Sequence, residues 1–327
     1  MSNFAKVSII ILNWDGLQDT IECLESLTKI TYPNYEIIIV DNGSIDGSIE
    51  TLKSKFPYIK MIENKINKGF AGGNNQGIKY AAENGAAYLL LLNNDTVVAP
   101  DFLNELVKVA ENHPEAGIIG PKIYDYKSNK IQCIGGKIDF CNLKTPFIEI
   151  GRGQTDNCQH NKIEDREWFT GCCWLAPIEV FSKVSLFDET SFFSYGEDTD
   201  LCYKVRRAGY RILYCPLANI WHKGGTSTGG RLSPLSFYFS TRNEITYMLK
   251  NGTARQKMFF ISFRYSIYPI LVLGYSMINS RMDLMKPLCF GLIYHLDHKE
   301  RYYVPTSSHS VHMKKGQQPL NNISLIC

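Results

Sequence analysis

The sequence has no strong excess of either charge. Its 35 lysine and arginine residues face 32 aspartate and glutamate residues, which leaves a net charge of +3. Surface-driven binding of nucleic acid normally needs a clustered basic excess, so charge gives no reason to expect a nucleic-acid partner. The apolar share of 44% and the charged share of 20% are ordinary for a globular protein. These values exclude a largely disordered chain, a collagen-like fibre and a coiled coil.

The ten cysteines lack the spacing of a metal or disulfide scaffold. No C-x-x-C pair occurs, only Cys172 and Cys173 are adjacent, and no histidine cluster has zinc-finger spacing. A chain of 327 residues is long enough to bury a core without disulfide support. Reduced thiols, and hence a cytoplasmic location, are therefore expected.

No unbroken apolar run reaches the roughly 20 residues that a membrane-spanning helix needs. The first run, Val7–Leu12, is too short for the core of a signal peptide and is interpreted as a strand. The longest candidate, Met258–Ile278, is interrupted by Arg264 and Pro269. Two interpretations of it stay open. It is either the core helix of a globular unit or a helix lying on a membrane, with its basic residues, Arg264 included, facing lipid headgroups.

The first hundred residues alternate regularly between strand and helix patterns. Short β-branched or leucine-rich runs predict buried strands, and apolar residues three or four apart predict the helices between them. The strands are expected at Val7–Leu12, Glu36–Val40, Tyr58–Ile62 and Tyr88–Leu92. This order predicts a parallel sheet with helices on both faces, as in nucleotide-binding α/β domains.

Beyond Pro100 the alternation is less regular. We expect a helix over Asp101–Glu111, a strand over Gly117–Pro121 that ends in a Gly-Pro turn, and an irregular hairpin region over 125–165. Further short strands and helices are predicted at Trp168–Ala176, Glu179–Val184, Leu201–Ala208, Arg211–Tyr214 and Ala218–His222. The residues from Lys299 onward are polar and are expected to form a frayed tail.

Polar residues gather where three of the predicted strands end. They are Asn13 after the first strand, Asp41 and Asn42 after the second, and Asn93, Asn94 and Asp95 after the fourth. Each one could be a simple turn former. Ligands of parallel α/β sheets bind beyond the carboxyl ends of the strands, however, so their convergence favours a ligand site. A carboxylate such as Asp95 can hold magnesium or manganese against a diphosphate.

Three carboxylates stand within four residues in Glu197-Asp198-Thr199-Asp200, before a predicted helix. Acidic residues are common helix caps, and this is the simplest interpretation of Asp200. Repulsion between like charges raises a carboxyl pKa, however, and a raised pKa suits a general base.

Two further segments are ambiguous by themselves. His222, at the end of a predicted strand, gains meaning only if it closes on Asp95. The glycine-rich stretch Gly69–Gly77 lacks the Gly-Lys-Ser/Thr end of a P-loop and the spacing of a dinucleotide fingerprint. Because it opens a helix, it could offer backbone N–H groups to a phosphate, or it could form a tightly packed loop.

Seven segments in order resemble the inverting glycosyltransferase family 2, and within it the rhamnosyltransferase-like branch that builds bacterial surface polysaccharides. They are VSIIILNWDG (Val7–Gly16), IIIVDNGSIDGS (Ile37–Ser48), NKGFAGGNNQGI (Asn67–Ile78), LLLLNNDTVV (Leu89–Val98), GCCWLAPIEVFSKVSLFDE (Gly171–Glu189), FFSYGEDTDLCYKVRRAGY (Phe192–Tyr210) and WHKGGTST (Trp221–Thr228). Together they extend over about three quarters of the chain.

The resemblance implies a GT-A fold, in which a mostly parallel, Rossmann-like central sheet is flanked by helices, here with a C-terminal helical extension. It implies a nucleotide-sugar-binding half at 1–99 and an acceptor-binding and catalytic half of the same domain at 100–230. A helical segment that could associate with a membrane follows at 231–298, and a polar tail at 299–327.

The resemblance also implies roles for site residues. Asp198 matches the catalytic base, and Glu197 and Trp168 would hold the acceptor. Asp95 looks like the last carboxylate of the family's DxD motif and would bind a divalent cation, magnesium or manganese, together with His222. The motif reads Asn93-Asn94-Asp95, so its first carboxylate is absent. The donor nucleotide would contact Asn13, Asp41, Asn42, Gly72, Asn74, Asn93 and Asn94.

The function implied is that of an inverting glycosyltransferase. It would move rhamnose or a hexose from a dTDP- or UDP-sugar to a hydroxyl of a saccharide or lipid-linked saccharide, by single displacement with a carboxylate base. The product would belong to a cell-surface polysaccharide. The expected location is the cytoplasm, with peripheral contact at the cytoplasmic face of the plasma membrane left open for the C-terminal segment.

Two alternatives compete with this function. A processive polysaccharide synthase would need several spanning helices and a Gln-x-x-Arg-Trp motif, and the sequence has neither. A catalytically inactive nucleotide-sugar-binding scaffold would be favoured by the loss of Asp95, Asp198 or His222, and all three are present. The residues therefore favour the enzyme.

Overall fold

The computed structural model describes residues 4–224 and 233–296. Contacts between Cα atoms divide the chain into two units. The first unit comprises Met1–Ile138 and Phe147–Ser227, and the second comprises Asp139–Pro146 and Thr228–Cys327. The predicted tail at 299–327 and the last four residues of the segment Trp221–Thr228 lie outside the described residues.

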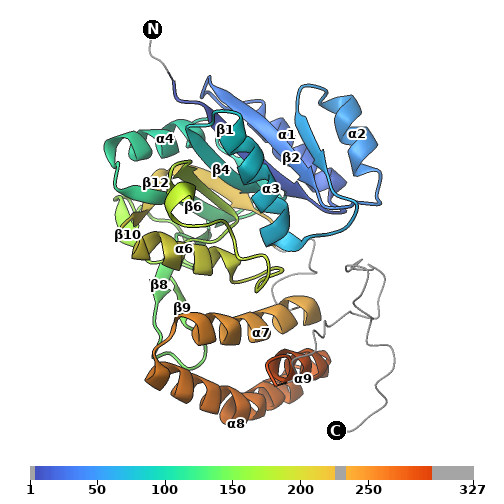
Figure 1. Ribbon diagram of the computed structural model, residues 1–327, viewed down its shortest axis with the longest axis vertical. Helices are drawn as coiled ribbons and strands as arrows, with labels where there is room; N and C mark the ends of the chain where they lie inside the picture. The colour runs from blue at the N-terminus through green and yellow to red at the C-terminus, as the bar shows by residue number, and fades with distance from the viewer. Residues whose placement is uncertain (1–3, 225–232, 297–327) are drawn as a thin grey trace. The chain divides into compact units, whose positions relative to one another are not determined.

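The first unit is built on one large sheet and a separate two-stranded ribbon. The strands of the large sheet are β1 (Val7–Asn13), β2 (Tyr35–Asp41), β3 (Lys60–Glu63), β4 (Tyr88–Asn93), β5 (Thr96–Val98), β6 (Ala116–Asp125), β7 (Ile131–Cys133), β10 (Glu164–Arg166), β11 (Cys173–Pro177) and β12 (Arg211–His222). Their order is β10-β12-β6-β11-β4-β1-β2-β3, with β5 on β12 and β7 on β6 (Figure 1). The ribbon pairs β8 (Gly136–Ile138) with β9 (Phe147–Glu149).

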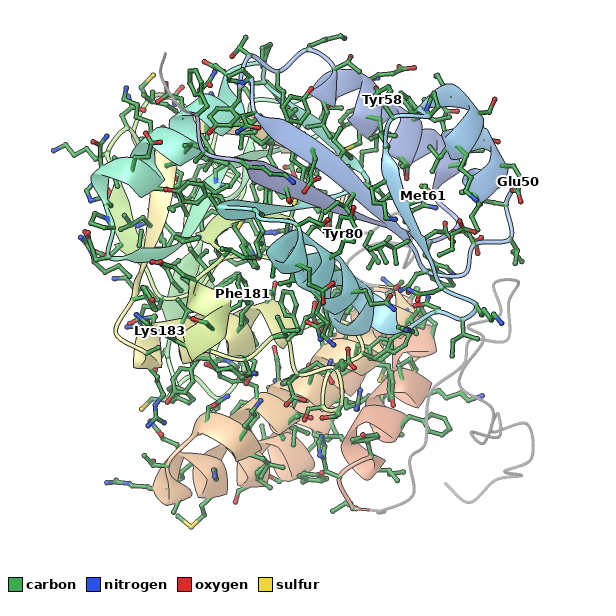
Figure 2. All side chains as sticks on the ribbon, turned by 45° about the horizontal axis from the view of Figure 1, so that its top comes forward. Glu50, Tyr58, Met61, Tyr80, Phe181 and Lys183 are labelled. Atoms are coloured by element: carbon green, nitrogen blue, oxygen red, sulfur yellow. The ribbon has the colours of Figure 1, made fainter. Side chains whose placement is uncertain are left out.

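Six helices of the first unit connect and cover these strands. They are α1 (Leu17–Leu27), α2 (Ser48–Lys55), α3 (Gly69–Glu83), α4 (Phe102–Asn112), α5 (Val180–Lys183) and α6 (Glu197–Arg207). Phe181 of α5, labelled in Figure 2, stacks on the buried Trp174 of β11 with ring centroids 6.5 Å apart.

The predicted α/β fold with a mostly parallel sheet is confirmed. β4, β1, β2 and β3 are parallel neighbours, and β6 is parallel to β12, while β11 runs antiparallel between β4 and β6. The isoleucines of β1 have no exposed surface, as expected for a strand covered on both faces. The register places Asn13 opposite Asp41 and Leu12 opposite Asn93, so the polar strand ends meet at one edge.

Two expectations about β6 and β12 were wrong for one reason. β6 does not end at the Gly-Pro turn but continues through Pro121 to Asp125, and the two predicted strands at Arg211–Tyr214 and Ala218–His222 are one strand. Proline has no N–H to give to a ladder and occurs in sheets at bulges. Here the β6–β12 register shifts between Cys215 and Asn219, just after the Cys215–Pro121 pair. The bulge accommodates the proline and lets both strands continue.

The glycine-rich stretch is the first part of α3 rather than a loop. A Cβ atom on Gly73 would stand 2.3 Å from the Leu12 side chain, and one on Gly77 would stand 2.5 Å from Ile10. Both distances are shorter than real Cβ contacts, so a larger residue would force Leu12 or Ile10 to shift. Glycine at these positions therefore lets α3 pack directly on β1, which is the close-packing alternative.

The second unit is helical. It contains α7 (Pro234–Asn251), α8 (Ala254–Ile278), a 3₁₀ turn (Met282–Leu284) and α9 (Met285–Ile293). Its core joins Ile245, Met248, Phe260, Val272, Leu288 and Leu292. Neither Arg264 nor Pro269 ends α8, and Arg264 is fully buried, paired with Glu244. Arg264 therefore does not face lipid headgroups, as one of the two open interpretations of this segment required.

Candidate functional site

The polar ends of β1 and β2 form one buried hydrogen-bond network. Asn13 donates from Nδ2 to Asp41 Oδ2 at 2.7 Å, and Thr20 Oγ1 donates to Asn13 Oδ1 at 2.7 Å. Asn94 Nδ2 donates in turn to Thr20 Oγ1 at 3.0 Å. The second carboxylate oxygen of Asp41 accepts the backbone N–H of Ser44 at 2.9 Å. The structure therefore gathers Asn13, Asp41 and Asn94 into one network, in which Thr20 and Ser44 also take part.

Asn42 connects the end of β2 to the start of α3. Its Nδ2 donates to Asn67 Oδ1 at 2.9 Å and to the carbonyl of Gly69 at 3.0 Å. Its Oδ1 accepts Asn64 Nδ2 at 3.1 Å. With these bonds Asn42 holds the approach to the helix, and contact with a nucleotide stays a prediction.

The first N–H groups of α3 already have acceptors within the protein. Gly69 N donates to Asn67 Oδ1 at 2.7 Å, and Phe70 N donates to the carbonyl of Phe193 at 2.8 Å. Asn74 uses its Nδ2 on the carbonyl of Phe70, within the helix. A Cβ on Gly72 would stand 3.0 Å from Lys68 Cβ. These contacts do not favour a phosphate at this helix end, and the donor roles of Gly72 and Asn74 stay predictions.

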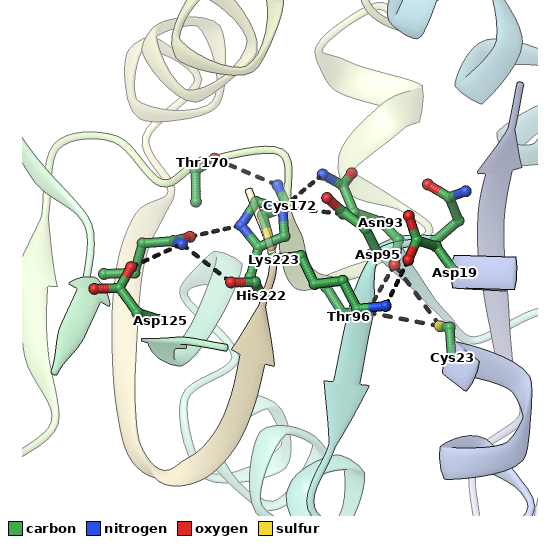
Figure 3. Close-up of polar contacts among 12 residues, drawn as sticks. Asp19, Cys23, Asn93, Asp95, Thr96, Asp125, Thr170, Cys172, His222 and Lys223 are labelled. Carbon is green, nitrogen blue, oxygen red and sulfur yellow. Dashed lines mark hydrogen bonds and ion pairs between the residues drawn. The ribbon is translucent and has the colours of Figure 1, made fainter. Parts of the chain in front are cut away.

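His222 closes on Asp95. The antiparallel pairing of β12 with β5 sets His222 opposite Thr96, and His222 Nε2 then lies 3.1 Å from Asp95 Oδ1 (Figure 3). Asn93 Nδ2 lies 3.4 Å from the same nitrogen. The carboxylate and the histidine come from segments more than 120 residues apart, and the condition for a functional role of His222 is met.

The amide of Gln132 fixes the orientation of the His222 ring, a contact that the sequence did not predict. Its Nε2 donates to Asp125 Oδ1 at 3.1 Å and to the carbonyl of His222 at 3.2 Å. Its Oε1 therefore faces His222 Nδ1, at 2.5 Å, and accepts the Nδ1 proton. Nε2 is left to face the Asp95 carboxylate (Figure 3).

An unprotonated Nε2 would face the Asp95 carboxylate with its lone pair, so a proton or a cation must lie between the two atoms. Burial lowers the pKa of His222, but Cys172 and Asp95 raise it more, and the net pKa lies well above the ordinary value. A proton on Nε2 satisfies the carboxylate, and a divalent cation bound by both atoms would take the place of that proton. The donor atoms thus fit a cation, although no three His, Cys, Asp or Glu residues group into a metal site within 4–224 and 233–296.

Cys172 was also missed by the sequence reasoning, although it lies in a segment that carries the family resemblance. Its thiol is hydrogen-bonded to His222, and its carbonyl accepts Asn93 N at 2.8 Å. Burial raises the pKa of this thiol to about 11, against the lowering effect of His222, so it stays protonated at neutral pH. The one available signal was the adjacent Cys172-Cys173 pair after a glycine.

Lys223 anchors the end of β12 to α1. Its Nζ pairs with Asp19 Oδ1 at 2.5 Å and with Glu22 Oε2 at 2.6 Å, and its backbone N–H donates to the carbonyl of Asp95 at 3.0 Å. These contacts hold the neighbouring His222 in place (Figure 3).

Asp198 is held by backbone N–H groups on both carboxylate oxygens. Gly171 N donates to Oδ2 at 2.8 Å, and Thr199 N donates to Oδ1 at 2.7 Å. Burial raises the pKa of Asp198, although these hydrogen bonds lower it. Gly171 directly precedes Cys172, so the segment Thr170–Cys172 contacts Asp198 through one residue and His222 through the next.

Glu197 and Asp200 differ in how their charges are satisfied. α6 begins at Glu197, so both carboxylates lie in its first turn. Asp200 pairs with Lys204 at 3.0 Å, in keeping with a structural role. Glu197 is buried, and its Oε2 has no hydrogen-bond partner among the described residues. Burial, with the nearby Asp198 charge, raises the pKa of Glu197 well above its ordinary value.

Trp168 lies in the core. Its indole N–H donates to the carbonyl of Lys137 at 3.1 Å, its ring packs near Phe147, and its side chain and backbone together are 6% exposed. Little of its surface is left for an acceptor, and its acceptor role stays a prediction. A separate cavity of about 570 Å³, lined by residues that include Lys137, Arg206 and Arg211, contains none of the predicted site residues.

Comparison with known sequences identifies a family. A family model described as "Glycosyl transferase family 2" matches residues 8–173. The uncharacterised protein y4gI of Sinorhizobium fredii is 31% identical over 76% of this chain, and the match spans 28% of that protein.

Two relatives carry activities in their names. The N-acetylglucosaminyl-diphospho-decaprenol L-rhamnosyltransferase of Mycobacterium tuberculosis is 27% identical over 63% of this chain and 72% of its own length. The low-salt glycan biosynthesis hexosyltransferase Agl10 of Haloferax volcanii is 23% identical over 90% of this chain and 92% of its own length.

Solved structures share the fold. The mannosyltransferase PcManGT from Pyrobaculum calidifontis, in complex with GDP-Man and Mn²⁺, superposes with a TM-score of 0.57 at 14% identity, over 91% of this chain and 89% of that one. GalNAc-T7 with UDP, GalNAc and Mn²⁺ gives a TM-score of 0.62 at 17% identity, over 90% of this chain and 59% of that one. At these identities the likeness shows the fold alone.

Proposed function

The chain belongs to glycosyl transferase family 2 and is a glycosyltransferase, and from that premise we propose that it inverts the anomeric carbon of a nucleoside-diphosphate sugar by single displacement. The proposed donor is a dTDP- or UDP-sugar that carries rhamnose or a hexose. The proposed acceptor is a hydroxyl of a saccharide or lipid-linked saccharide. The names of the Mycobacterium and Haloferax relatives, a rhamnosyltransferase for a decaprenol-linked sugar and a hexosyltransferase of glycan synthesis, support this choice.

One observation carries the proposal. The candidate base and the candidate cation site share the segment Thr170–Cys172, in which Gly171 N donates to Asp198 and Cys172 contacts His222. His222 in turn contacts Asp95. A reaction that removes a proton at one point and gathers negative charge at a leaving diphosphate needs both groups at one site.

Asp198 would act on the acceptor. As the acceptor oxygen bonds to the anomeric carbon, its proton passes to the Asp198 carboxylate, and the bond from that carbon to the diphosphate oxygen breaks on the opposite face. General base catalysis of this kind contributes roughly 10²–10⁴-fold. Burial makes Asp198 a stronger base than an exposed carboxylate, and the N–H groups of Gly171 and Thr199 fix its orientation.

Glu197 would bind the acceptor. Its buried Oε2 lacks a partner among the described residues, and such an orphaned group is costly unless a ligand satisfies it. The raised pKa favours the protonated form, which can donate a hydrogen bond to a sugar oxygen. This pairing gives the two adjacent carboxyls different tasks.

Asp95 and His222 would hold a magnesium or manganese ion. When bound, the ion stabilises the negative charge that develops on the leaving diphosphate. Gln132 keeps the Nδ1 proton engaged, so that Nε2 is the nitrogen presented to the ion. Asn93, which stands where the family's first carboxylate would be, lies beside the same nitrogen. We expect the enzyme to act at the cytoplasmic side of the membrane that carries a lipid-linked acceptor.

The test begins with binding. Purified protein is titrated with nucleoside diphosphates and with dTDP- and UDP-sugars, with and without manganese, and bound donors are then assayed for transfer to saccharide acceptors. Asp198→Asn should keep donor binding and lose transfer. Asp200→Asn is the matched control in the same helical turn and should keep transfer.

Two results would count against the proposal. Transfer retained by Asp198→Asn would remove this residue as the base. Donor binding by the wild-type protein without transfer to any acceptor, by contrast, would favour the inactive scaffold.

A further inference from the structure

We propose that the outward side of α8 lies on a lipid bilayer surface that carries anionic headgroups. This inference concerns the second unit alone and does not depend on the chemistry of the first. It gives a defined surface to the membrane contact that the sequence left open.

The outward side of α8 is apolar. Ile270 is 69% exposed, Met277 67% and Ile278 84%. Nine large apolar side chains of this helix are exposed, and at 100° per residue seven of them fall within one arc of about 160°, with Met258 and Tyr275 outside it. We call these seven the α8 face: Phe259, Ile267, Ile270, Leu271, Leu273, Met277 and Ile278. A contiguous apolar surface of this kind marks a contact site, because soluble monomers rarely expose one.

The charge in the middle of α8 is buried and contributes nothing to the exposed surface of this face. Arg264 is the one charged residue between Met258 and Ser280, and it is fully buried. Its guanidinium pairs with Glu244, donates to the carbonyl of Lys144 at 2.8 Å, and lies over the Tyr268 ring at 4.2 Å. The α8 face is therefore free of charge along its length.

The same contacts favour a helix that lies on a bilayer over one that crosses it. By length and composition α8 could span a membrane, and no other described helix meets that test. A crossing helix would carry the Arg264–Glu244 pair into hydrocarbon, or would separate Arg264 from its partners, and either is expensive. On the opposite side from the face, Tyr265 also donates its hydroxyl proton to the carbonyl of Leu292 at 2.7 Å. An amphipathic helix with one side in the headgroup region keeps all these contacts.

Basic residues near both ends of the helix indicate what covers the α8 face. Arg255 is exposed and Lys257 half-buried at one end, and Lys286 is exposed just beyond the other. Arg281 is paired with Asp283 at 2.9 Å and adds no net charge. Pairing two copies of the face, in either direction, would bring basic ends together. Anionic headgroups instead complement both ends, so the surface fits a bilayer better than a second copy of the chain.

The experiment is flotation of the full chain with vesicles of phosphatidylcholine alone and with one third phosphatidylglycerol. The wild-type protein should float, and more strongly with phosphatidylglycerol. Ile270→Asp/Met277→Asp should lower the partition coefficient by about tenfold or more, the factor expected for losing one buried apolar side chain. Because both positions are exposed, the variant should keep its thermal unfolding midpoint and its nucleoside-diphosphate binding.

A matched control carries the same change on the first unit. Ile45 and Leu217 are 78% and 59% exposed, and Ile45→Asp/Leu217→Asp should partition as the wild type does. Arg255→Gln/Lys286→Gln should retain binding to phosphatidylcholine and lose most of the gain from phosphatidylglycerol.

Three results would overturn the proposal. The first is a wild-type protein that does not float with either vesicle. The second is equal loss in the control variant. The third is a dimer in solution that Ile270→Asp/Met277→Asp dissociates while vesicle binding is unchanged, which would make a second copy the occupant. None of these outcomes depends on donor binding or transfer, so the proposed function and this inference can fail separately.

Discussion

Buried polar groups have hydrogen-bond partners in the network at the strand ends, whereas one at the start of α6 does not. Around Asn13, each polar atom of the β1 and β2 ends has a partner within the protein. At the start of α6, Glu197 is buried with an oxygen that lacks one. A saturated network stabilises the native state, whereas an unsatisfied buried acid lowers its stability and can be explained by a ligand. The contrast separates side chains whose hydrogen bonds are complete within the protein from Glu197, to which we assign the acceptor under the proposed function.

The largest expected effect separates activity from stability at Asp198. Asp198→Asn should lower transfer by roughly 10²–10⁴-fold. Its effect on the free energy of unfolding should be small, because two terms oppose each other. The neutral amide relieves a buried carboxylate whose raised pKa shows that ionisation is disfavoured, but its nitrogen cannot accept one of the two backbone N–H groups, of Gly171 and Thr199, that Asp198 accepts. Single-turnover assays and urea unfolding of the same preparation measure both. A large loss of stability would show that Asp198 has a structural role.

A variant of Gln132 tests a polar contact that is satisfied within the protein, here at the candidate cation site. Gln132→Leu removes the acceptor for His222 Nδ1 and the link to Asp125. Loss of such a supporting contact typically weakens metal binding by about 10–100-fold. Manganese binding to the free protein, followed by electron paramagnetic resonance, reports this without any assay of transfer. Gln154→Leu, an exposed change in the same hairpin region, should leave binding unchanged.

Asn13 tests the cost of opening the saturated network. Asn13→Leu removes the donor to Asp41 Oδ2 and the acceptor of the Thr20 hydroxyl proton, although Thr20 Oγ1 still accepts from Asn94. A buried unsatisfied polar group costs about 1–3 kcal/mol. Urea unfolding should show a loss of that size. Asn34→Leu, an exposed asparagine before β2, should change stability by no more than about 0.5 kcal/mol. Equal losses of stability in Asn13→Leu and Asn34→Leu would show that the buried network adds nothing to the cost of removing Asn13.

The last prediction is a pH-dependent gain in the free energy of unfolding when Glu197 is replaced by glutamine. Because the folded-state pKa is raised, the native state holds this proton more tightly than the unfolded chain. The wild type therefore loses stability as pH rises from the ordinary glutamate pKa through the raised one. Glu197→Gln removes that loss, so the variant should match the wild type in acid and be more stable than it at pH 8. A variant that is less stable at pH 8 would show that the ionised group is stabilised by a partner.

The sheet could be predicted because its strands are buried on both faces. Continuous runs such as Ile9–Ile11 have one physical use, and they form the centre of the parallel sheet. The convergence of polar strand ends followed from parallel geometry alone. The ends of elements were harder, since α6 begins at Glu197 and the β6–β12 pair continues through a bulge that only the partner strand explains.

The supporting contacts could not be predicted. Gln132 lies in a region without periodicity and meets His222 across 90 residues, so its role depends on tertiary packing. Cys172 looked like one of ten scattered cysteines until the fold brought it to the histidine. The glycines of α3 left a phosphate site and close packing both open, and Gly73 and Gly77 pack against β1. Each case depends on a neighbour far along the chain.

The segment Asp139–Pro146 belongs to the second unit although the chain on both sides of it belongs to the first. This affects what happens when the chain is cut between the units. Within that unit Phe140 stacks on Tyr247 with ring centroids 5.8 Å apart, and Lys144 accepts from Arg264. A single proteolytic nick between 224 and 233 would therefore yield two fragments that stay associated through these eight residues. Co-expressed as separate polypeptides cut at that point, the halves should co-purify by fragment complementation. A simple truncation there would instead leave this segment without its partners.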